Sequence, residues 1–169
     1  MNRFLYDEAK FNEKYDQYYK LVYRTAYQYL FSAEAAEDAL QEAFVKLLTH
    51  KKSFNEEEHE KAWLLRVTVN ICKNMLKSKA NHHSELNESL RESGTDFEEI
   101  SDAKIDMENE LKNLTPVQRT AVFLFYFEDY STKEISKILK MNENTVKSHL
   151  RRGRERLKNG ISKEGYDEI

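Results

Sequence analysis

Cysteine, proline and glycine are scarce in this chain of 169 residues. Its one cysteine, Cys72, excludes an intramolecular disulfide and any zinc site built on cysteines, which is typical of a cytoplasmic protein. One proline and four glycines leave few helix breakers in a sequence rich in Glu, Lys, Leu and Ala. The composition therefore predicts an all-α protein.

Long apolar runs are also missing. No run approaches the roughly 18–20 residues that span a bilayer, and the N-terminus, MNRFLYDEAK, has no apolar signal-peptide segment. The sequence shows no nucleophile–base pair, no metal-binding cluster and no phosphate-cradling loop. We therefore expect no membrane insertion, no metal, no cofactor and no catalytic residue, and hence a protein that is not an enzyme.

Charge is segregated along the chain, although the net charge is only −3. Residues 61–83 hold five lysines and arginines and no acid, whereas residues 84–110 hold ten acids and two bases. Residues 131–160 hold nine bases and three acids. Two basic segments flank an acidic one. A basic surface that binds a polyanion can therefore exist locally although the net charge of the chain is slightly negative.

The acidic stretch also divides the chain. It is polar and poor in aliphatic residues, which is typical of a flexible tether. We predict two small helical domains, over residues 1–80 and 104–163, joined by a flexible acidic linker over residues 81–103.

The clearest motif lies in Tyr130–Lys158. Ser131 and Glu134 have the spacing of a capping box, and Asn142 is a good N-cap for a second helix after a tight corner. The apolar face of this second helix is expected to comprise Val146, Leu150, Gly153 and Leu157. The opposite face would carry Asn144, Thr145, Lys147, Ser148, Arg151, Arg152 and Glu155.

Such a face has the groups that read a DNA major groove. Arg and Lys pair with guanine edges, Asn and Thr reach other bases, and flanking cations contact phosphates. The alternative is an ordinary helical hairpin whose basic face is only solvated. Two consecutive capped helices with a short corner favour a DNA-binding helix-turn-helix.

Three helices are predicted before the linker. They cover Phe11–Leu30, Ser32 to about His50, and Glu60–Lys79, with a loop at Lys51–His59. The packing face of the first is expected to comprise Phe11, Tyr15, Tyr18, Val22, Ala26 and Tyr29. The second has an acidic outer face that includes an apolar side chain, which indicates either a partner surface or simple solvation. This outer face includes Asp38, Gln41, Glu42 and Val45.

The third predicted helix has two different sides. One side can be buried and comprises Leu64, Val67, Thr68, Ile71, Cys72 and Met75. The other comprises Trp63, Arg66, Asn70, Lys73, Asn74 and Lys77. An aromatic ring, amides and cations along one strip suit a nucleic-acid strand, through stacking, edge contacts and phosphate contacts. The alternative is a half-buried tryptophan beside solvated lysines, and this segment alone does not decide between them.

A further helix start precedes the helix-turn-helix. After a short helix at Ile105–Leu114, Thr115, Pro116 and Gln118 have the pattern of an N-cap, a first helical proline and a capping box. The helix that they open is expected to run through Phe127 and to form the apolar centre of the second domain.

Three segments in this order resemble bacterial RNA polymerase sigma factors of the extracytoplasmic-function class. AEDALQEAFVKLL is similar to the family's helix that docks on core polymerase, and AWLLRVTVNICKNMLK to its helix for melted minus-ten DNA. LTPVQRTAVFLFYFEDYSTKEISKILKMNENTVKSHLRRGRERL is similar to the region that reads the minus-thirty-five element. The helix-turn-helix alone also resembles response-regulator domains, but the three segments together are specific. The resemblance covers about Phe11–Lys79 and Ile105–Lys158.

The resemblance implies a sigma factor whose partners are core RNA polymerase and promoter DNA, with an anti-sigma factor as a further candidate. It places the Phe54–Glu58 loop and Asn70 around a flipped minus-ten base. The implied minus-ten residues are Phe54, Asn55, Trp63, Arg66, Asn70, Lys73 and Lys77. The implied minus-thirty-five residues are Asn144, Thr145, Lys147, Ser148, Arg151 and Arg152. The implied polymerase contacts are Asp38, Gln41 and Glu42, to which the residue pattern adds Val45.

Two features depart from the family pattern. Residues 55–58 are unusually acidic for a loop that lines DNA. Gly153 stands where alanine is common, and an interior glycine costs about 1 kcal/mol of helix stability, which a close helix–helix approach would explain. Two other functions stay open: a dimeric helix-turn-helix regulator, which would require a palindromic site, and an adaptor that binds only proteins.

Overall fold

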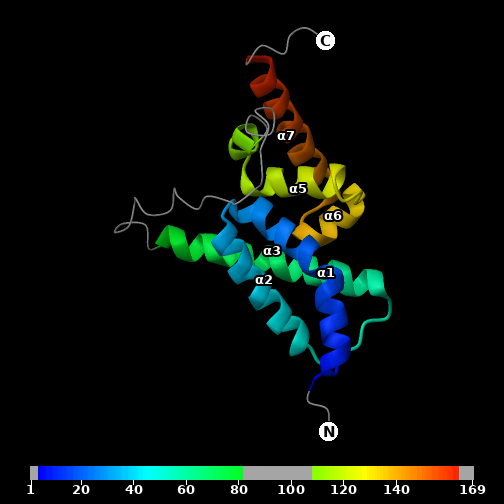
Figure 1. The fold of residues 1–169 in the computed structure, drawn as a ribbon. Coiled ribbons are helices and arrows are strands. Elements are labelled where there is room, and N and C mark those ends of the chain that lie inside the picture. Colours follow the sequence, from blue (N-terminus) through cyan, green and yellow to red (C-terminus); the bar gives the residue numbers. More distant parts are fainter. Residues whose placement is uncertain (1–3, 82–107, 164–169) are drawn as a thin grey trace. The chain divides into compact units, whose positions relative to one another are not determined.

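The computed structural model describes residues 4–81 and 108–163, and these residues form helices, turns and short connections without a strand (Figure 1). The predicted all-α class is confirmed. The chain divides into two compact units, Met1–Ser93 and Gly94–Ile169. The predicted linker lies almost entirely outside the described residues. Of the predicted helix Ile105–Leu114, residues 108–112 are helical and the first three lie outside the description.

Unit 1 is built from three helices that all pack on one another: α1 (Glu8–Leu30), α2 (Ala33–Leu48) and α3 (Glu57–Asn81). Side-chain caps start the first two. Asp7 accepts the backbone N–H of Lys10, and Ser32 accepts that of Ala35. Phe31, with φ of 51°, provides the left-handed residue that lets the chain turn from α1 into α2.

The core of unit 1 follows the predicted periodicity on α2. All five predicted core positions are buried, namely Ala36, Leu40, Ala43, Phe44 and Leu47. A buried leucine contributes about 1.5–3 kcal/mol. On α1, four of the six predicted positions are buried and Phe11 is half-buried; the four are Tyr18, Val22, Ala26 and Tyr29. Tyr15 is 37% exposed, but its ring lies 4.7 Å from that of Phe44 between centroids.

Helix α3 differs from its prediction in both its start and its buried face. It begins at Glu57, so Glu57 and Glu58 belong to its first turn and not to the loop. Val67 and Met75 are only half-buried. The buried residues are Glu60, Leu64, Leu65, Thr68, Val69, Ile71 and Cys72. The buried arc is wide because α3 packs against both α1 and α2.

Unit 2 contains α5 (Pro116–Tyr126), α6 (Thr132–Leu139) and α7 (Glu143–Lys163). Both predicted capping boxes are present, at Thr115 with Gln118 and at Ser131 with Glu134. The predicted end of α5 is one residue too late. Phe127 is its C-cap and is 71% exposed, so it does not belong to the core.

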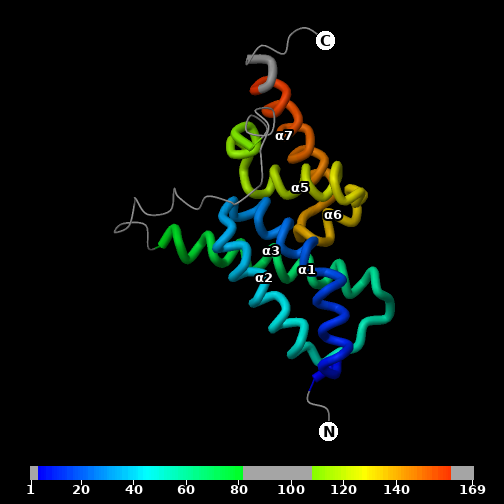
Figure 2. Tube along the Cα trace, viewed as in Figure 1, coloured from blue at the N-terminus to red at the C-terminus, as the bar shows by residue number. Residues whose placement is uncertain are grey.

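The helix-turn-helix is formed by α6 and α7, and Figure 2 follows the turn between them. Lys140 closes α6 in the left-handed region, with φ of 52°. Asn142 then accepts the backbone N–H of Thr145 at 2.8 Å, as expected of an N-cap. Of the predicted buried face of α7, Val146, Leu150 and Gly153 are buried and Leu157 is half-buried.

Among the described residues, no helix combines the length and the apolar character that crossing a bilayer requires.

Candidate DNA and polymerase surfaces

The outer face of α7 carries the cations predicted to contact DNA. Lys147, Arg151 and Arg152 are exposed, as is Asn144, while Thr145 and Ser148 are half-buried. The two hydroxyls are engaged within the helix, where Thr145 donates to Asn142 and Ser148 donates to the carbonyl of Asn144. The long charged side chains therefore project furthest from the unit.

Other arginines of α7 are bonded to the rest of unit 2. Arg154 donates to the hydroxyl of Tyr126 at 3.0 Å, and Arg156 donates to the carbonyl of Asn113 at 3.2 Å and to Gln118 Oε1 at 3.3 Å. These two stabilise the packing of α7 on the preceding segments. The sequence pattern had already placed Arg151 and Arg152 on the other face.

The N-terminal end of α7 is tied to α6. Thr132 donates to Glu143 Oε1 at 2.6 Å, and the ammonium of Lys147 lies 3.8 Å from the same oxygen. Burial, together with the charge of Arg152, lowers the pKa of His149. The imidazole therefore adds no charge to this face at neutral pH, and the lysine and arginines of the outer face dominate it.

The outer strip of α3 starts at a group of three rings, which we call the ring cluster: His50, Phe54 and Trp63. The Trp63 ring lies 4.5 Å from His50 and 5.4 Å from Phe54 between centroids, and His50 stacks on Phe54 at 4.8 Å. All three side chains are half-buried. The cluster joins the end of α2, the connecting loop and the second turn of α3, and its rings offer faces for stacking.

Sequence reasoning found two members of the ring cluster and missed His50. Its one available signal was its position four residues before Phe54, and a lone histidine at a helix end is usually just a polar surface residue. Farther along α3, Asn70, Lys73 and Lys77 are exposed, Arg66 is half-buried, and Asn55 in the loop is exposed. Trp63 and Asn70 are seven residues apart, which is about two turns, or about 10 Å, along one side of the helix.

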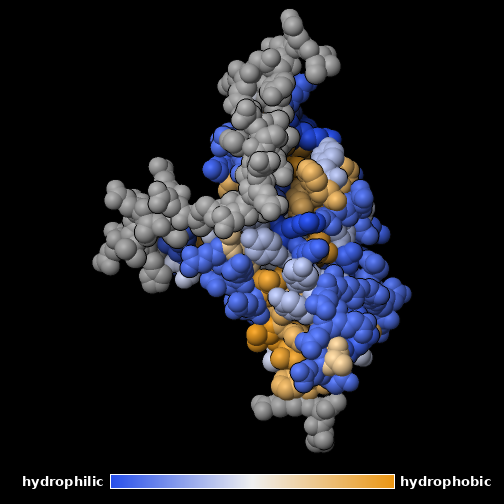
Figure 3. Space-filling view, in the orientation of Figure 1, coloured by the Kyte–Doolittle hydropathy of each residue, from blue (hydrophilic) through white to orange (hydrophobic). Residues whose placement is uncertain are grey.

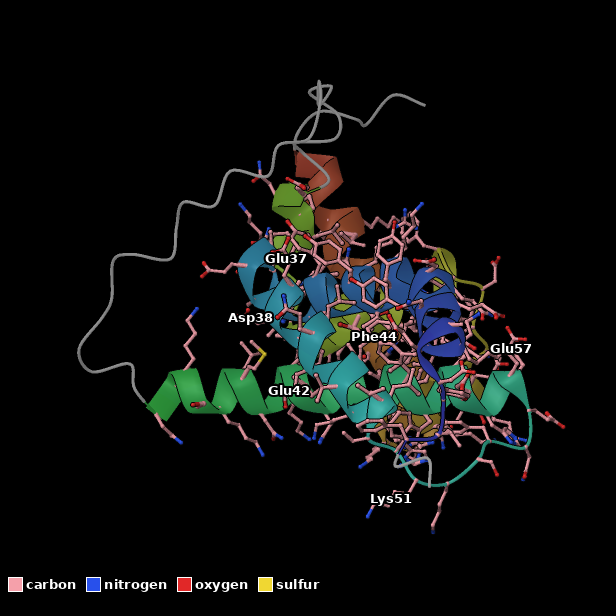
Figure 4. The ribbon with its side chains drawn as sticks, turned by 60° about the horizontal axis from the view of Figure 1, so that its bottom comes forward. Glu37, Asp38, Glu42, Phe44, Lys51 and Glu57 are labelled. Atoms are coloured by element: carbon pink, nitrogen blue, oxygen red, sulfur yellow. The ribbon has the colours of Figure 1, made fainter. Side chains whose placement is uncertain are left out.

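The outer face of α2 is acidic with one apolar side chain. Asp38, Gln41 and Glu42 are exposed, and Val45 is 57% exposed. Figure 4 shows Glu37, Asp38 and Glu42 following one another along α2, and in Figure 3 apolar colour gathers over the C-terminal half of this helix.

Burial and, to a smaller extent, the acids of α2 raise the pKa of one group on each neighbouring helix. The charge of Glu37 adds to burial in raising the pKa of Tyr23 on α1. Likewise, burial raises the pKa of the Cys72 thiol on α3 to about 12, with a smaller contribution from the charge of Glu42.

The side chain of Glu60 is a buried carboxylate that sequence reasoning missed. It is 2% exposed, in the first turn of α3. It accepts hydrogen bonds from Tyr6, from Tyr18 at 3.0 Å and from the ammonium of Lys14 at 2.8 Å. Burial raises the pKa of Glu60, but these hydrogen bonds and the Lys14 charge together lower it below its usual range.

The same contacts raise the pKa of both tyrosines. Burial is the largest cause for Tyr6 and for Tyr18, and hydrogen bonding to the Glu60 carboxylate adds to it. In the sequence Glu60 follows three other acids and looks solvated, so no local pattern distinguishes it.

The described part of the chain contains no group of three or more His, Cys, Asp or Glu side chains placed to hold a metal ion.

Comparison with known proteins gives matches over both units. The family model described as Sigma-70 region 2 matches residues 15–82, and the model described as Sigma-70, region 4 matches residues 105–157. The ECF RNA polymerase sigma factor SigW of Bacillus subtilis (strain 168) is 28% identical over 166 residues, covering 90% of this chain and 89% of that protein.

Further relatives agree with these matches. ECF RNA polymerase sigma factor SigM of Mycobacterium tuberculosis (strain ATCC 25618 / H37Rv) is 28% identical over 151 residues, covering 89% of this chain and 76% of that protein. Among solved structures, the sigma factor RpoE from Bartonella quintana, crystallised with the anti-sigma factor NepR, is similar with a TM-score of 0.73 and 22% identity. That match covers 94% of this chain and 99% of the other, and it shows a shared fold.

Proposed function

The chain belongs to the extracytoplasmic-function class of the sigma-70 family, and we propose how its residues divide the work of transcription initiation. It is a sigma factor, whose partners are core RNA polymerase and promoter DNA. The observation that carries the proposal is the order of three outward faces: the acidic face of α2, the polar strip of α3 and the cationic face of α7.

The α7 face reads the minus-thirty-five duplex. Arg151, Arg152 and Lys147 are exposed and long enough to reach base edges or phosphates, and Asn144 lies near the helix start. Thr145 and Ser148 are on the same face and complete the set. A helix presented by a helix-turn-helix enters the major groove with its N-terminal half, where these residues lie.

The α3 strip and the ring cluster hold the melted minus-ten strand. Flipping a base costs a few kcal/mol, which stacking at about 1–3 kcal/mol per base and hydrogen bonds to the base edge offset. Phe54 and Trp63 supply ring faces beside the exposed Asn55, and Asn70 supplies an amide farther along the strip. Arg66, Lys73 and Lys77 are placed to follow the phosphates.

The α2 face docks on core polymerase. Asp38 and Glu42 supply negative charge, Gln41 supplies an amide, and Val45, about one turn beyond Gln41, supplies exposed apolar surface. Acids followed by an exposed apolar side chain on one face suit a basic and partly apolar partner surface.

The protein would act without catalysis of its own, in the cytoplasm, where polymerase and chromosome are found. The solved relative was crystallised with its anti-sigma factor. We include such an inhibitor among the proposed partners of this chain.

Transcription with purified core polymerase on a randomised promoter library tests the function as a whole. We expect transcripts only when both protein and core enzyme are present, from promoters with two unlike elements. Recovery of palindromes that bind the protein without polymerase would instead support a stand-alone dimeric regulator.

Two arginines of α7 form a matched pair for testing the duplex contacts. Arg151→Ala should weaken minus-thirty-five binding by about 1–3 kcal/mol if Arg151 contacts a base. If Arg151 contacts a phosphate, the slope of the logarithm of the binding constant against the logarithm of salt concentration should fall by about 1. Arg154→Ala removes the same charge from a side chain that is bonded to Tyr126, so binding should change little. Equal losses in fluorescence anisotropy titrations would contradict the assigned face.

Asn70 tests the division between the two DNA elements. Asn70→Ala should slow promoter opening and change which minus-ten base is preferred, while binding of the isolated minus-thirty-five duplex stays unchanged. An unaltered base preference would reduce Asn70 to a structural role.

A further inference from the structure

We propose that the buried carboxylate of Glu60 and its partner Lys14 form a positioning device, which fixes the first turns of α3, and with them the ring cluster, relative to α1. The proposal rests on the role assigned above to the ring cluster and Asn70 in holding melted DNA. It adds residues that never touch DNA to those that decide how well the promoter opens.

Three donors from separate places converge on one carboxylate. Tyr6 comes from the segment before α1, while Lys14 and Tyr18 come from successive turns of α1. Lys14 is only 11% exposed at its side chain. A second tie joins the same elements, because Gln17 of α1 donates to Glu57, and Figure 4 places Glu57 at the start of α3. The N-terminal end of α3 is therefore bonded to α1 at two successive positions of one face.

Stability alone does not account for an ion pair at this position. Removing two charges from water costs several kcal/mol each, and apolar residues of similar volume are often as stable or more stable. Directional hydrogen bonds, in contrast, define the rotation and the height of a helix turn, which apolar contacts between smooth side chains do not. The best-attested use of a buried polar group is to fix register, as a single buried asparagine does in coiled coils.

The ring cluster lies next to this anchor. Glu60 and Trp63 are three residues apart on α3, so a rotation or shift of the turn at Glu60 moves the Trp63 ring directly. Phe54 and His50 pack on Trp63 and would move with it. A binding site displaced by about 1 Å can lose much of its function, because contacts to a captured base require a geometry held within a fraction of an ångström.

The test separates positioning from stability by replacing the carboxylate and its three donors with apolar residues. The quadruple variant Glu60→Leu, Lys14→Met, Tyr6→Phe and Tyr18→Phe keeps the side-chain volume and leaves no tyrosine hydroxyl without its acceptor. It should therefore remain as stable as the parent in urea unfolding followed by Trp63 fluorescence. We expect it to open promoters about tenfold or more slowly with polymerase, measured by permanganate reactivity of minus-ten thymines. Its base preference should also weaken, while co-purification with core enzyme and minus-thirty-five affinity stay at parent values.

A matched control lowers stability without touching the anchor. Val69→Ala removes core volume from the same helix and should open promoters at the parent rate below its melting temperature. Parent-like opening and base preference in the stable quadruple variant would overturn the proposal. Equally slow opening in Val69→Ala would also overturn it, because opening would then follow the stability of unit 1 rather than the anchor.

Direct-contact variants keep this failure distinct from failure of the assigned function. Trp63→Ala and Asn70→Ala should impair promoter opening whether or not Glu60 has a positioning role. If they impair it and the apolar quadruple variant does not, only the positioning role is wrong. If they also leave opening and base preference intact, the assignment of α3 to melted DNA is wrong and the positioning role falls with it.

Discussion

The glycine at residue 153 shows how a single position is chosen by the approach of two helices. A Cβ atom built there would lie 2.9 Å from Val122 Cγ2 of α5, closer than side chains normally pack. The absence of a side chain lets α7 pack closely on α5, which is the close approach that the sequence had suggested. The close packing of α7 on α5 offsets the conformational entropy cost of a glycine inside the helix.

Gly153→Ala should therefore destabilise unit 2 although alanine is the better helix former. Overpacking costs about 1–3 kcal/mol, and the gain in helix propensity is about 1 kcal/mol, so we expect a net loss of about 1 kcal/mol. Hydrogen exchange of amides in α5 and α7 measures this unit separately. In a Val122→Ala background the sign should reverse, because the methyl group then has room. Stabilisation of the parent by Gly153→Ala would contradict the close contact.

The carboxylate of Glu60 predicts a pH dependence for the stability of unit 1. Its folded-state pKa is lowered from the ordinary 4.5, so the ionised group stabilises the fold above the unfolded pKa and this contribution is lost as the pH falls through the folded pKa. Glu60→Gln leaves Lys14 without its counter-charge and should cost on the order of 3 kcal/mol at pH 7.

The difference in the free energy of unfolding between the parent and Glu60→Gln should decrease as the pH is lowered below 4.5. Urea unfolding at several pH values, followed by the fluorescence of Trp63, the one tryptophan of the chain, measures it. Glu13→Gln is the matched control, because Glu13 makes only an exposed pair with Lys10 and should change stability by less than about 0.5 kcal/mol. A Glu60 deficit that stays constant with pH would contradict the buried pair.

At the scale of elements, helix starts that depend on local chemistry were predictable and those that depend on distant partners were not. The capping boxes at Thr115 and Ser131 involve residues three apart, so the sequence alone shows them. The start of α3 at Glu57 is supported by contacts from α1, more than 40 residues away in the case of Tyr18 and Glu60. A run of acids cannot reveal such contacts.

The buried faces divide in the same way. On α2 one apolar stripe faces one core, and each of the five positions that its periodicity predicted is buried. On α3 two neighbouring helices cover two sides, so Leu65 and Val69 are buried beyond the predicted stripe. The candidate site divides in the same way. Trp63 was predicted from residue type and resemblance and Phe54 from resemblance alone, whereas His50 joins them only through the tertiary packing of their rings.

The α2 face supports a prediction about assembly with polymerase. Asp38→Arg with Glu42→Arg should abolish co-purification with core enzyme at moderate salt, because it places two cations where the proposed partner surface is basic. Circular dichroism should show unchanged helicity, since both side chains are exposed. Glu8→Arg with Glu13→Arg makes the same change in net charge on exposed positions of α1 and should leave assembly intact. Undiminished binding by the α2 variant would remove polymerase docking from this face.

At the scale of the whole molecule, the segregation of charge along the chain affects how the protein binds DNA in the absence of polymerase. Residues 84–110 carry ten acids and two bases between two segments assigned to DNA, and most of this stretch lies outside the described residues. Within a Debye length of about 8–10 Å, carboxylates compete with phosphates for lysine and arginine. We expect the free chain to bind promoter DNA weakly for this reason, and binding to polymerase to relieve the competition.

Neutralising the linker tests this expectation in the full-length chain. Changing the six acids from Glu85 to Glu99 to Gln or Asn should tighten binding of the free protein to the minus-thirty-five duplex several-fold at low salt. The difference in affinity between the neutralised and the parent chain should decrease as the salt concentration rises, because salt screens the attraction between the linker acids and the basic surfaces in the parent. A control that keeps the six acids and changes Asn87, Ser89 and Ser93 to Gln alters the same segment at constant charge and should bind as the parent does. Equal affinities of the neutralised and parent chains at low salt would contradict this competition. The acids would then have the simpler role of keeping the segment solvated and extended. Repulsion among like charges has that effect without any contact to the DNA-binding surfaces.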